Sequence, residues 1–467
     1  MPEPSRLEQQ IDLDVPAEEA FAWHQRPGAV ERVLPPFIRA SIVHVDERFR
    51  ALEEGGRLSV KRPWGPFRFV IEGVLVDCDP PRQFGVEVGP ADKPWYRMRL
   101  RFEPRDEGRR CRLHLDIELL HLGGLIGRLC RTRSHLVRQL EREVAYRREL
   151  LPAELAMHAR YADRPRLTVA ISGASGLIGR NLAAVLASGG HRVIRLVRRA
   201  QPDTPDAVLW QPESGIADTA PLEGIDAVVH LAGENIAARR WTRSQMARLR
   251  HSRIAATQNL SESLKRMNAP PRVMIGASAI GIYGDRGEQW LDEDSEPGEG
   301  FLAEVGREWE AAARLMETVG TRVVNARLGV VLTPEGGALR KMLPAFRLGL
   351  GGPLGSGRQW QSWVGIDDCL AAMLHMLMSD ELSGPVNVVA PEPVRQRDFA
   401  RTLGRVLGRP AFLPAPAFAL RLMLGRLADE ALLASARVRS AKLTEAGLPF
   451  RHHALEAALR HLLGRVM

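Results

Sequence analysis

The sequence predicts an α/β protein in which helices cover both faces of a doubly wound parallel sheet, preceded by an α+β domain and followed by a small C-terminal helical domain. Residues 167–182 join a short apolar run to a glycine-spaced turn and the start of a helix. Residues 1–158 carry strand-like runs and then a long amphipathic stretch, and the chain beyond about residue 405 is helical in character. Because 467 residues suffice for about three domains of roughly 150 residues, we place the domains at 1–158, 166–405 and 406–467.

The first domain begins with a strand pattern and ends with a helix pattern. Ile11, Leu13 and Val15 alternate as on a half-buried strand, and Pro16 opens a short helix. Further strands are predicted at RLSVKR, FRFVIEGVLVD, YRMRLRFEP and CRLHLDIEL, each bounded by turn residues. A period near 3.6 then predicts a long helix that buries Leu136, Leu140, Val144, Leu151 and Leu155.

This order of elements resembles the helix-grip fold of the START and polyketide-cyclase-like superfamily. The resemblance implies a cavity for an apolar ligand between the sheet and the long helix. The alternative is a packed domain without a ligand, because element order is not a sharp motif. Trp23, Trp64 and Trp95 either line the cavity or fill the core.

The polar segment from His158 to Pro165 is a connector, and the strand, turn and helix follow it. In GASGLIG, Gly173 permits a tight turn, Gly176 permits close approach of the backbone to a pyrophosphate, and Gly179 permits helix and strand to pack closely. Free N–H groups at the helix start bind phosphates. The alternative is a turn capped by Ser172 or Ser175. The predicted cofactor contacts are Gly173, Ala174, Ser175, Gly176, Leu177, Ile178 and Gly179.

The GxxGxxG spacing resembles the short-chain dehydrogenase/reductase superfamily, and the length of the region resembles its extended branch. The resemblance implies a Rossmann-type sheet that binds NAD(P). The segment GIDAVVHLAGENI resembles that branch's fourth strand. It implies that Leu231, Ala232 and Gly233 lie where the family places the nicotinamide ribose.

Two arginines decide between the two dinucleotides. Arg198 and Arg199 lie 19 and 20 residues after Gly179, where an acidic residue would favour NAD and an arginine favours the 2′-phosphate of NADP. We therefore predict NADP(H). The alternative is a solvated arginine pair in an arginine-rich chain.

The catalytic pair of the superfamily, Tyr-x-x-x-Lys, is absent. Of the four tyrosines only Tyr283 lies in this half, and no lysine stands four residues beyond a tyrosine. The preferred alignment with the superfamily's motif puts Phe301 at the tyrosine position and Val305 at the lysine position. The usual hydroxyl position is Ala279, with Ser278 one residue early.

These departures resemble the epimerase-like family of atypical extended short-chain proteins. Its marks are GASGLIGR, LAGENI, GIYGD, REWE, RLGVVL, the stretch from GGALRKML to WVGIDD, and GPVNVVAP. Some members carry a helix-grip domain in front, and a few of those bear a cell-division-inhibitor label. The family name implies sugar-nucleotide chemistry.

Several residues are candidates for chemistry or substrate binding. Tyr283 is the best remaining acid and Ser278 a candidate partner, although Tyr283 equally fits a structural role in the Tyr-Gly turn. A glycine-rich segment from Gly336 to Arg358 predicts a substrate lid, with a structural crossover as the alternative. The candidate substrate contacts are Glu234, Asn235, Arg327, Lys341 and Arg358.

Four further polar residues have structural explanations. Asp367 and Asp368 precede an apolar helical run, which favours an N-cap over a metal site. His230 lies inside an apolar strand and is expected in the core. Arg253 either braces the site or is solvated.

Composition limits the partners. The net charge of +9 comes from scattered arginines without interleaved aromatic residues, so we expect no nucleic-acid partner. Cys78, Cys111, Cys130 and Cys369 form no metal-ligand spacing, so we expect no metal and a reduced, cytoplasmic location. The N-terminus lacks an apolar signal segment, and no stretch is long enough to span a membrane.

The sequence leaves three functions open. One is an NADP(H)-dependent oxidoreductase or epimerase that acts on a small molecule and has an apolar-ligand-binding front domain. The second is a non-catalytic NADP(H)-binding sensor or regulatory protein that uses the front domain for a ligand or partner. The third is lipid or isoprenoid carriage, with the reductase fold as a scaffold. The oligomeric state is not predicted.

Overall fold

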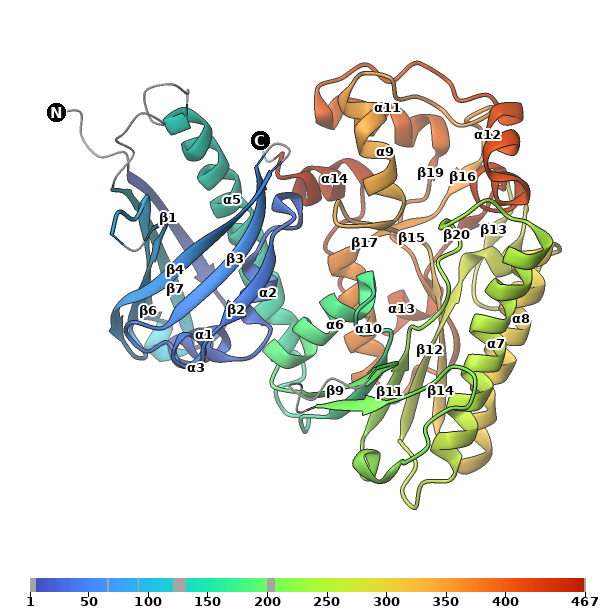
Figure 1. Cartoon of the computed structure of the whole chain (residues 1–467), viewed down its shortest axis with the longest axis horizontal. Helices are drawn as coiled ribbons and strands as arrows, with labels where there is room; N and C mark the ends of the chain where they lie inside the picture. The colour runs from blue at the N-terminus through green and yellow to red at the C-terminus, as the bar shows by residue number, and fades with distance from the viewer. Residues whose placement is uncertain (1–5, 65–66, 91, 121–131, 200–205, 466–467) are drawn as a thin grey trace. The chain divides into compact units, whose positions relative to one another are not determined.

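The computed structural model describes residues 6–64, 67–90, 92–120, 132–199 and 206–465. The chain divides into two compact units (Figure 1). The N-terminal unit comprises Met1–Pro165, Ala184–Gly190 and His461–Met467, and the C-terminal unit comprises Arg166–Ala183 and His191–Arg460.

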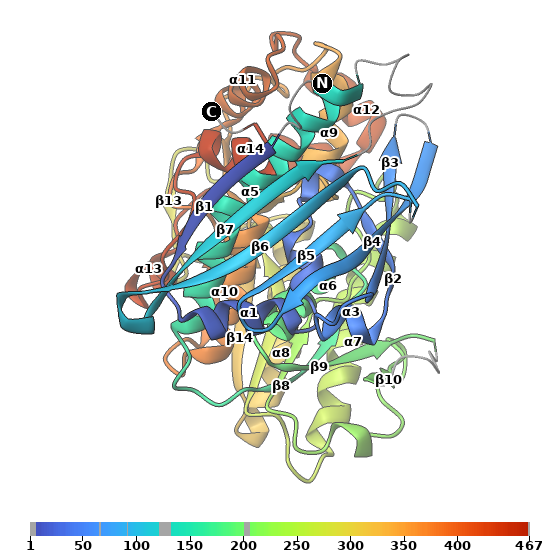
Figure 2. The same cartoon turned by 90° about the vertical axis from the view of Figure 1, so that its left-hand side faces the viewer.

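The N-terminal unit is built on a seven-stranded antiparallel sheet of order β1-β7-β6-β5-β4-β3-β2 (Figure 2). Its strands are β1 (Arg6–Leu13), β2 (Ser41–Val45), β3 (Arg57–Trp64), β4 (Phe67–Asp79), β5 (Gln83–Val88), β6 (Tyr96–Arg105) and β7 (Arg110–Leu119). The predicted strands are confirmed, and β2 and β5 were not predicted. Both are short: β2 is an edge strand with partly exposed side chains, and Gly85 interrupts the apolar pattern of β5.

A long helix packs against this sheet. Helix α5 (Thr132–Ala159) contacts β1 and buries all five residues predicted to face the core. The shorter helices are α1 (Ala17–Gln25), α2 (Ala29–Val33) and α3 (Glu47–Arg50), with single turns at Pro36–Ile38 and Asp106–Gly108. Trp23 is fully buried in the core, and Trp95 is partly buried against a second apolar cluster. The side chain of Trp64 lies outside the described residues.

The C-terminal unit contains a seven-stranded sheet of order β10-β9-β8-β11-β12-β14-β18, in which every neighbouring pair is parallel. Its strands are β8 (Thr168–Ser172), β9 (Arg192–Val197), β10 (Ala207–Leu209), β11 (Ala227–His230), β12 (Val273–Ala279), β14 (Arg322–Leu328) and β18 (Gly384–Val388). The chain reverses its direction of winding between β8 and β11, which is the switch point of a doubly wound sheet.

Helices cover both faces of this sheet. Helix α8 (Phe301–Arg314) packs on β12 and β14 and contacts α7 (Arg243–Lys265), whereas α6 (Leu177–Ser188) and α10 (Ile366–Met378) lie on the other face (Figure 1). The predicted α/β fold class with a preceding antiparallel sheet is confirmed. No described helix has the length and apolar character needed to cross a membrane.

The remaining elements surround the carboxyl end of the sheet and form the tail. The helices are α9 (Gly337–Arg347), α11 (Gln396–Leu407), α12 (Ala417–Leu424), α13 (Ala441–Glu445) and α14 (Leu455–Leu463). Short strands pair as β13 (Trp290–Leu291) with β20 (Arg437–Val438), β15 (Val330–Leu332) with β17 (Trp363–Gly365), and β16 (Trp360–Gln361) with β19 (Val394–Arg395). The shorter turns are Ala220–Leu222, Ile280–Tyr283, Leu315–Val319 and Ala428–Leu433. The tail is therefore joined to the sheet unit through β20.

Arg32 and Glu154 form a buried bidentate ion pair between α2 and α5, with N–O distances of 2.8 and 2.9 Å. Replacing Arg32→Ala leaves the carboxylate buried without its partner, so we expect a loss of about 3–5 kcal/mol in the stability of the N-terminal unit. Hydrogen exchange of the α5 amides under increasing urea measures this loss.

The control is Arg112→Ala, because the Arg112–Asp12 pair is largely exposed. Its loss should cost below ~1 kcal/mol. Equal effects of the two substitutions would contradict the prediction.

Candidate functional site

The glycine turn lies between β8 and α6. Gly173 has φ of 72°, and a Cβ there would lie 2.9 Å from the backbone of Leu231 and Ala232. A Cβ at Gly179 would lie 2.3 Å from the Gly173 carbonyl oxygen. At Gly176 a Cβ would meet, among the described residues, the Gly173 carbonyl oxygen at 3.0 Å and nothing else within 4 Å. Two glycines are thus required for packing, and the third leaves the backbone open on its outer side.

This turn stands at the switch point of the sheet. The Leu231 N–H donates to the Ser172 carbonyl oxygen at 3.1 Å, so the carboxyl ends of β8 and β11 are joined. Residues 174–178, at the start of α6, and residues 231–233 therefore border one edge of the sheet. In open α/β sheets this crevice is where ligands bind.

His230 is a core residue, as expected. Its ring is fully buried at the end of β11, and Nδ1 lies 2.6 Å from the Ser172 hydroxyl. Burial lowers the pKa of His230 to about 4, so the ring is neutral near pH 7. Its function is to hold β8 and β11 together beneath the turn.

Arg198 and Arg199 follow directly after β9, beside the glycine turn. Both side chains are exposed, and neither forms an ion pair with a carboxylate of the described residues. Two guanidinium groups are therefore available to an anionic ligand at this edge. Residues 200–205, which follow them, lie outside the described part.

The segment after β11 is braced from α7. Arg253 donates to the Glu234 carbonyl oxygen at 2.9 Å, and its guanidinium lies 5.1 Å from the ring centre of Trp309. Burial lowers the pKa of Arg253 to about 10. Arg253 therefore braces the site, whereas the neighbouring Asn235 side chain is exposed and the Glu234 side chain is half-buried.

Three candidate residues, Ser278, Tyr283 and Arg327, meet in one buried network. Arg327 donates to both carboxylate oxygens of Glu310, at 2.8 and 2.9 Å, and to the Tyr283 hydroxyl at 2.9 Å. Ser278 donates to Glu310 at 2.7 Å, and the Tyr283 hydroxyl lies 2.8 Å from Asn387 Oδ1. The network joins β12, α8, β14 and β18, so these side chains fix the carboxyl end of the sheet.

The Tyr283 phenol is poorly suited to acid–base chemistry. It has no solvent exposure, and burial raises its pKa to about 12 although Arg327 acts in the opposite direction. Ser278 is 1% exposed. Sequence reasoning did not single out Glu310 or Asn387; the sequence signal for Glu310 is its place on the apolar face of α8.

The two residues at the positions of the missing tyrosine and lysine also lie in apolar surroundings. Phe301 and Val305 are buried on α8 and pack with Trp241, Leu249 and Leu427. Neither position offers a proton, and no lysine reaches it from the described residues that pack there.

Much of the segment predicted to be a lid or a crossover is helical, because Gly337–Arg347 forms helix α9. Leu339, Leu343 and Phe346 bury one face of this helix, and that apolar spacing outweighs the glycines at its start. Lys341 is exposed on α9 and donates to the Ala237 carbonyl oxygen, so it contacts the segment after β11. Arg358 is exposed beyond α9.

The N-cap prediction for Asp367 and Asp368 is wrong. Gly365 is the N-cap of α10, and both aspartates lie in the first turn. Asp368 is buried and accepts from the backbone N–H groups of Arg451 and His452 at 2.6 and 3.2 Å. Burial raises the pKa of Asp368 to about 6. This carboxylate therefore ties the tail to α10, a long-range contact that spacing does not reveal.

The N-terminal unit contains a cavity of about 140 Å³ that is partly open to solvent. Its walls are mostly apolar side chains from the sheet, α2 and α5, and Trp23 and Trp95 are not among them. The charged or polar groups on the wall are His24, Arg62, Glu72, Tyr96, Glu143 and Arg147.

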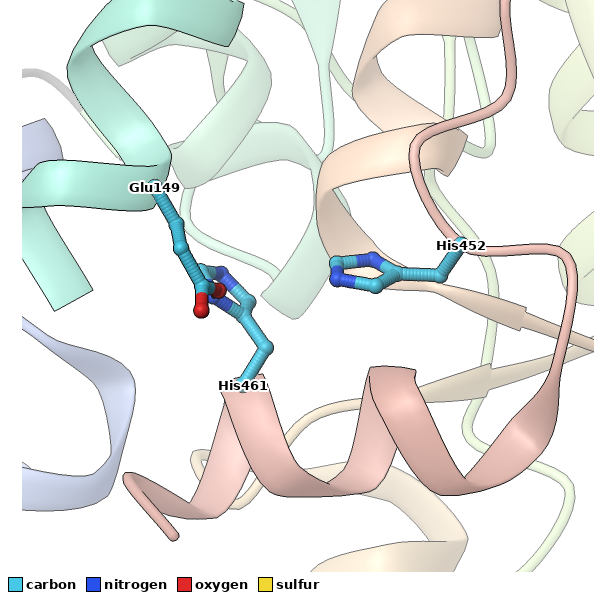
Figure 3. A group of neighbouring side chains, drawn as sticks. All are labelled: Glu149, His452 and His461. Carbon is cyan, nitrogen blue, oxygen red and sulfur yellow. The ribbon is translucent and has the colours of Figure 1, made fainter. Parts of the chain in front are cut away.

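A histidine and a carboxylate also meet within the N-terminal unit. His461 Nδ1 lies 2.7 Å from Glu149 on α5 (Figure 3). His452, the third residue drawn, belongs to the C-terminal unit, where its backbone binds Asp368. Cys78, Cys111 and Cys369 are free thiols, and Cys130 lies outside the described residues.

Comparison with known proteins places these features in a family. The model of the NAD dependent epimerase/dehydratase family matches residues 169–389, and a domain of unknown function, DUF1731, matches residues 415–462. Epimerase family protein MT2273 of Mycobacterium tuberculosis is 44% identical over 297 residues, which are 64% of this chain and 98% of that protein.

Two solved structures are similar over different extents. The nucleoside-diphosphate sugar epimerase of Corynebacterium glutamicum is 31% identical with a TM-score of 0.78, and the match covers 98% of this chain and 90% of that one. It therefore includes the N-terminal unit. Human epimerase family protein SDR39U1, solved with NADPH, is 34% identical with a TM-score of 0.59 and covers 64% of this chain and 100% of its own.

The resemblance to the extended short-chain proteins is confirmed by these matches, which extend over both the parallel sheet and the tail. The residues matched by the family model include the glycine turn at the switch point of the sheet. This chain belongs to the epimerase family of NAD(P)-binding extended short-chain dehydrogenase/reductases.

Proposed function

We propose that this chain binds NADP(H) at the carboxyl ends of β8 and β11. The observation that carries the proposal is the glycine turn whose outer side is open, with the two exposed guanidinium groups of Arg198 and Arg199 on the adjacent strand end. The structure of the human relative with NADPH supports the same cofactor.

The residues present fit such a cofactor. Residues 174–178 would receive the pyrophosphate on N–H groups at the start of α6, and residues 231–233 would border the nicotinamide ribose. Arg198 and Arg199 would bind the 2′-phosphate by charge-assisted hydrogen bonds. A bound nicotinamide supplies hydride transfer, so the proposed activity is that of an oxidoreductase or epimerase on a small molecule.

Of the proposed substrate contacts, Glu234 and Asn235 lie in the segment after β11, and Lys341 on α9 contacts this segment at Ala237. Arg358 is exposed beyond α9. Arg327 is fully engaged by Glu310 and Tyr283, so it would shape the pocket wall from behind.

A specific observation favours a second function, that of a non-catalytic NADP(H) sensor. Phe301 and Val305 occupy the positions of the missing pair, and the candidate acid Tyr283 is buried and hydrogen-bonded. A protein with this arrangement can bind the dinucleotide without transferring a proton.

We propose further that the N-terminal unit is a START-like domain with an apolar ligand in its cavity. The antiparallel sheet, the long helix α5 and the mostly apolar walls support this function. The three free thiols support the proposed cytoplasmic location.

The Arg198→Ala substitution tests the cofactor. We expect the affinity for NADPH to fall roughly tenfold or more, because charge-assisted hydrogen bonds to the 2′-phosphate are lost, while the affinity for NADH is unchanged. Calorimetric titration with both dinucleotides measures the two affinities.

The control is Arg192→Ala, which removes the same charge from the opposite end of β9, where Arg192 pairs with Asp206. NADPH affinity should be preserved in this variant. Equal affinities of the parent protein for NADPH and NADH would refute the 2′-phosphate contact.

Tyr283→Phe separates the enzyme from the sensor. If Tyr283 is the acid, NADPH oxidation with carbonyl and enone substrates should fall by roughly 10²-fold or more. If the protein is a sensor, neither form should turn over, and NADPH binding should be equal in both. Absorbance at the nicotinamide band follows oxidation, and fluorescence titration follows binding.

A parent protein that turns over at a rate unchanged by Tyr283→Phe would exclude Tyr283 from the mechanism. It would leave the buried network as a structural feature only.

A further inference from the structure

The cavity of the N-terminal unit contains a guanidinium group that has no counter-charge among the described residues. Arg147 projects from α5 into the cavity wall and is only 9% exposed. Among the residues that the structure describes, no acceptor meets its Nε, and its Nη1 is directed at the sulfur of Met98. A thioether is a weak acceptor and carries no charge.

The other charges in the buried part of the wall are already paired. Arg62 lies 3.1 Å from the Glu143 carboxylate, which also accepts from Gln139 at 2.7 Å. Glu72 is the other acidic residue on the wall, and it is exposed to solvent. Among the described residues, the buried or partly buried charged groups on the wall therefore comprise two guanidiniums and one carboxylate, with an excess of one positive charge.

The neighbouring histidine does not change this balance. His24 donates from Nδ1 to the Ala20 carbonyl oxygen at 2.8 Å, and its Nε2 is buried without a partner among the described residues. Burial, with the nearby charge of Arg147, lowers the pKa of His24 to about 4, so the ring is neutral near pH 7.

An unpaired cation in an apolar wall is unfavourable unless a ligand supplies the missing anion, because desolvation of the charge is not offset. The volume limits that ligand. An apolar cavity of about 150 Å³ accommodates benzene, and the cavity here measures about 140 Å³.

We propose that the N-terminal unit binds a small apolar carboxylic acid whose carboxylate lies on Arg147 and whose apolar body, of about the size of one ring, fills the cavity. This inference rests on the proposed ligand-binding function of the unit and names the chemical class of its ligand. A single carboxylate balances the single excess charge, and the apolar walls exclude strongly hydrated anions.

The test uses the full chain and three one-ring probes of similar size: benzoate, benzyl alcohol and benzylamine. Calorimetry or ligand-observed NMR measures each affinity. We expect benzoate to bind roughly tenfold or more tightly than benzyl alcohol, and benzylamine most weakly, because only the acid gains a charge-assisted hydrogen bond.

Arg147→Met keeps the apolar stem and should abolish the preference for benzoate over benzyl alcohol. The matched control is Arg148→Met, the next residue on α5, which is exposed and should retain the preference. Arg147→Lys should keep part of it, which guards against a failure of the methionine variant to fold. The hydrogen exchange of α5 reports folding in each variant.

The outcomes separate two failures. If the acid and the alcohol bind the parent protein equally, the carboxylate inference is overturned and the apolar cavity remains. If no probe binds, the ligand-binding function itself is overturned. A preference for benzoate that persists in Arg147→Met would assign the anion to another group and would also overturn the inference.

Discussion

The approach of the Gly173 backbone to that of Leu231 and Ala232 is the constraint on which the site of the C-terminal unit depends. With a Cβ at Gly173 only 2.9 Å from these atoms, β8 and β11 could not end side by side. Their adjacency creates the crevice at the switch point and directs the start of α6 toward it. The Ser172–His230 hydrogen bond below the turn completes the same contact from the core side.

Beyond this crevice, the carboxyl end of the sheet is held by charge. Arg327 and Glu310 form a buried bidentate pair that also engages Ser278 and Tyr283. Here the hydroxyl groups of Ser278 and Tyr283 are held by fixed partners, and the apolar side chains of Phe301 and Val305 are buried nearby on α8. This end of the sheet is therefore rigid and offers no exposed hydroxyl group among these residues.

The N-terminal unit differs from this arrangement, because one charged side chain on its cavity wall, Arg147, has no ion-pair partner among the described residues. Glu143 and Arg147 lie on the same face of α5 as Leu140 and Val144, at helical spacing. Charged residues on a buried helical face are costly without partners. One of the two has its partner in Arg62, and the other faces the cavity, which gives this unit a chemical preference of its own.

Several features of this protein could be predicted from the sequence alone. They are the glycine turn, the end of strand β11, the long helix α5 and the absence of Tyr-x-x-x-Lys. Each of them depends on residues only a few positions apart in the chain. The edge strand β2, the helix α9 within a glycine-rich segment, and the contact of Asp368 with residues 451–452 required the tertiary structure. So did the burial of Tyr283 and the isolation of Arg147. Burial and pairing depend on side chains brought together from distant segments, and that environment sets the charge and availability of each group.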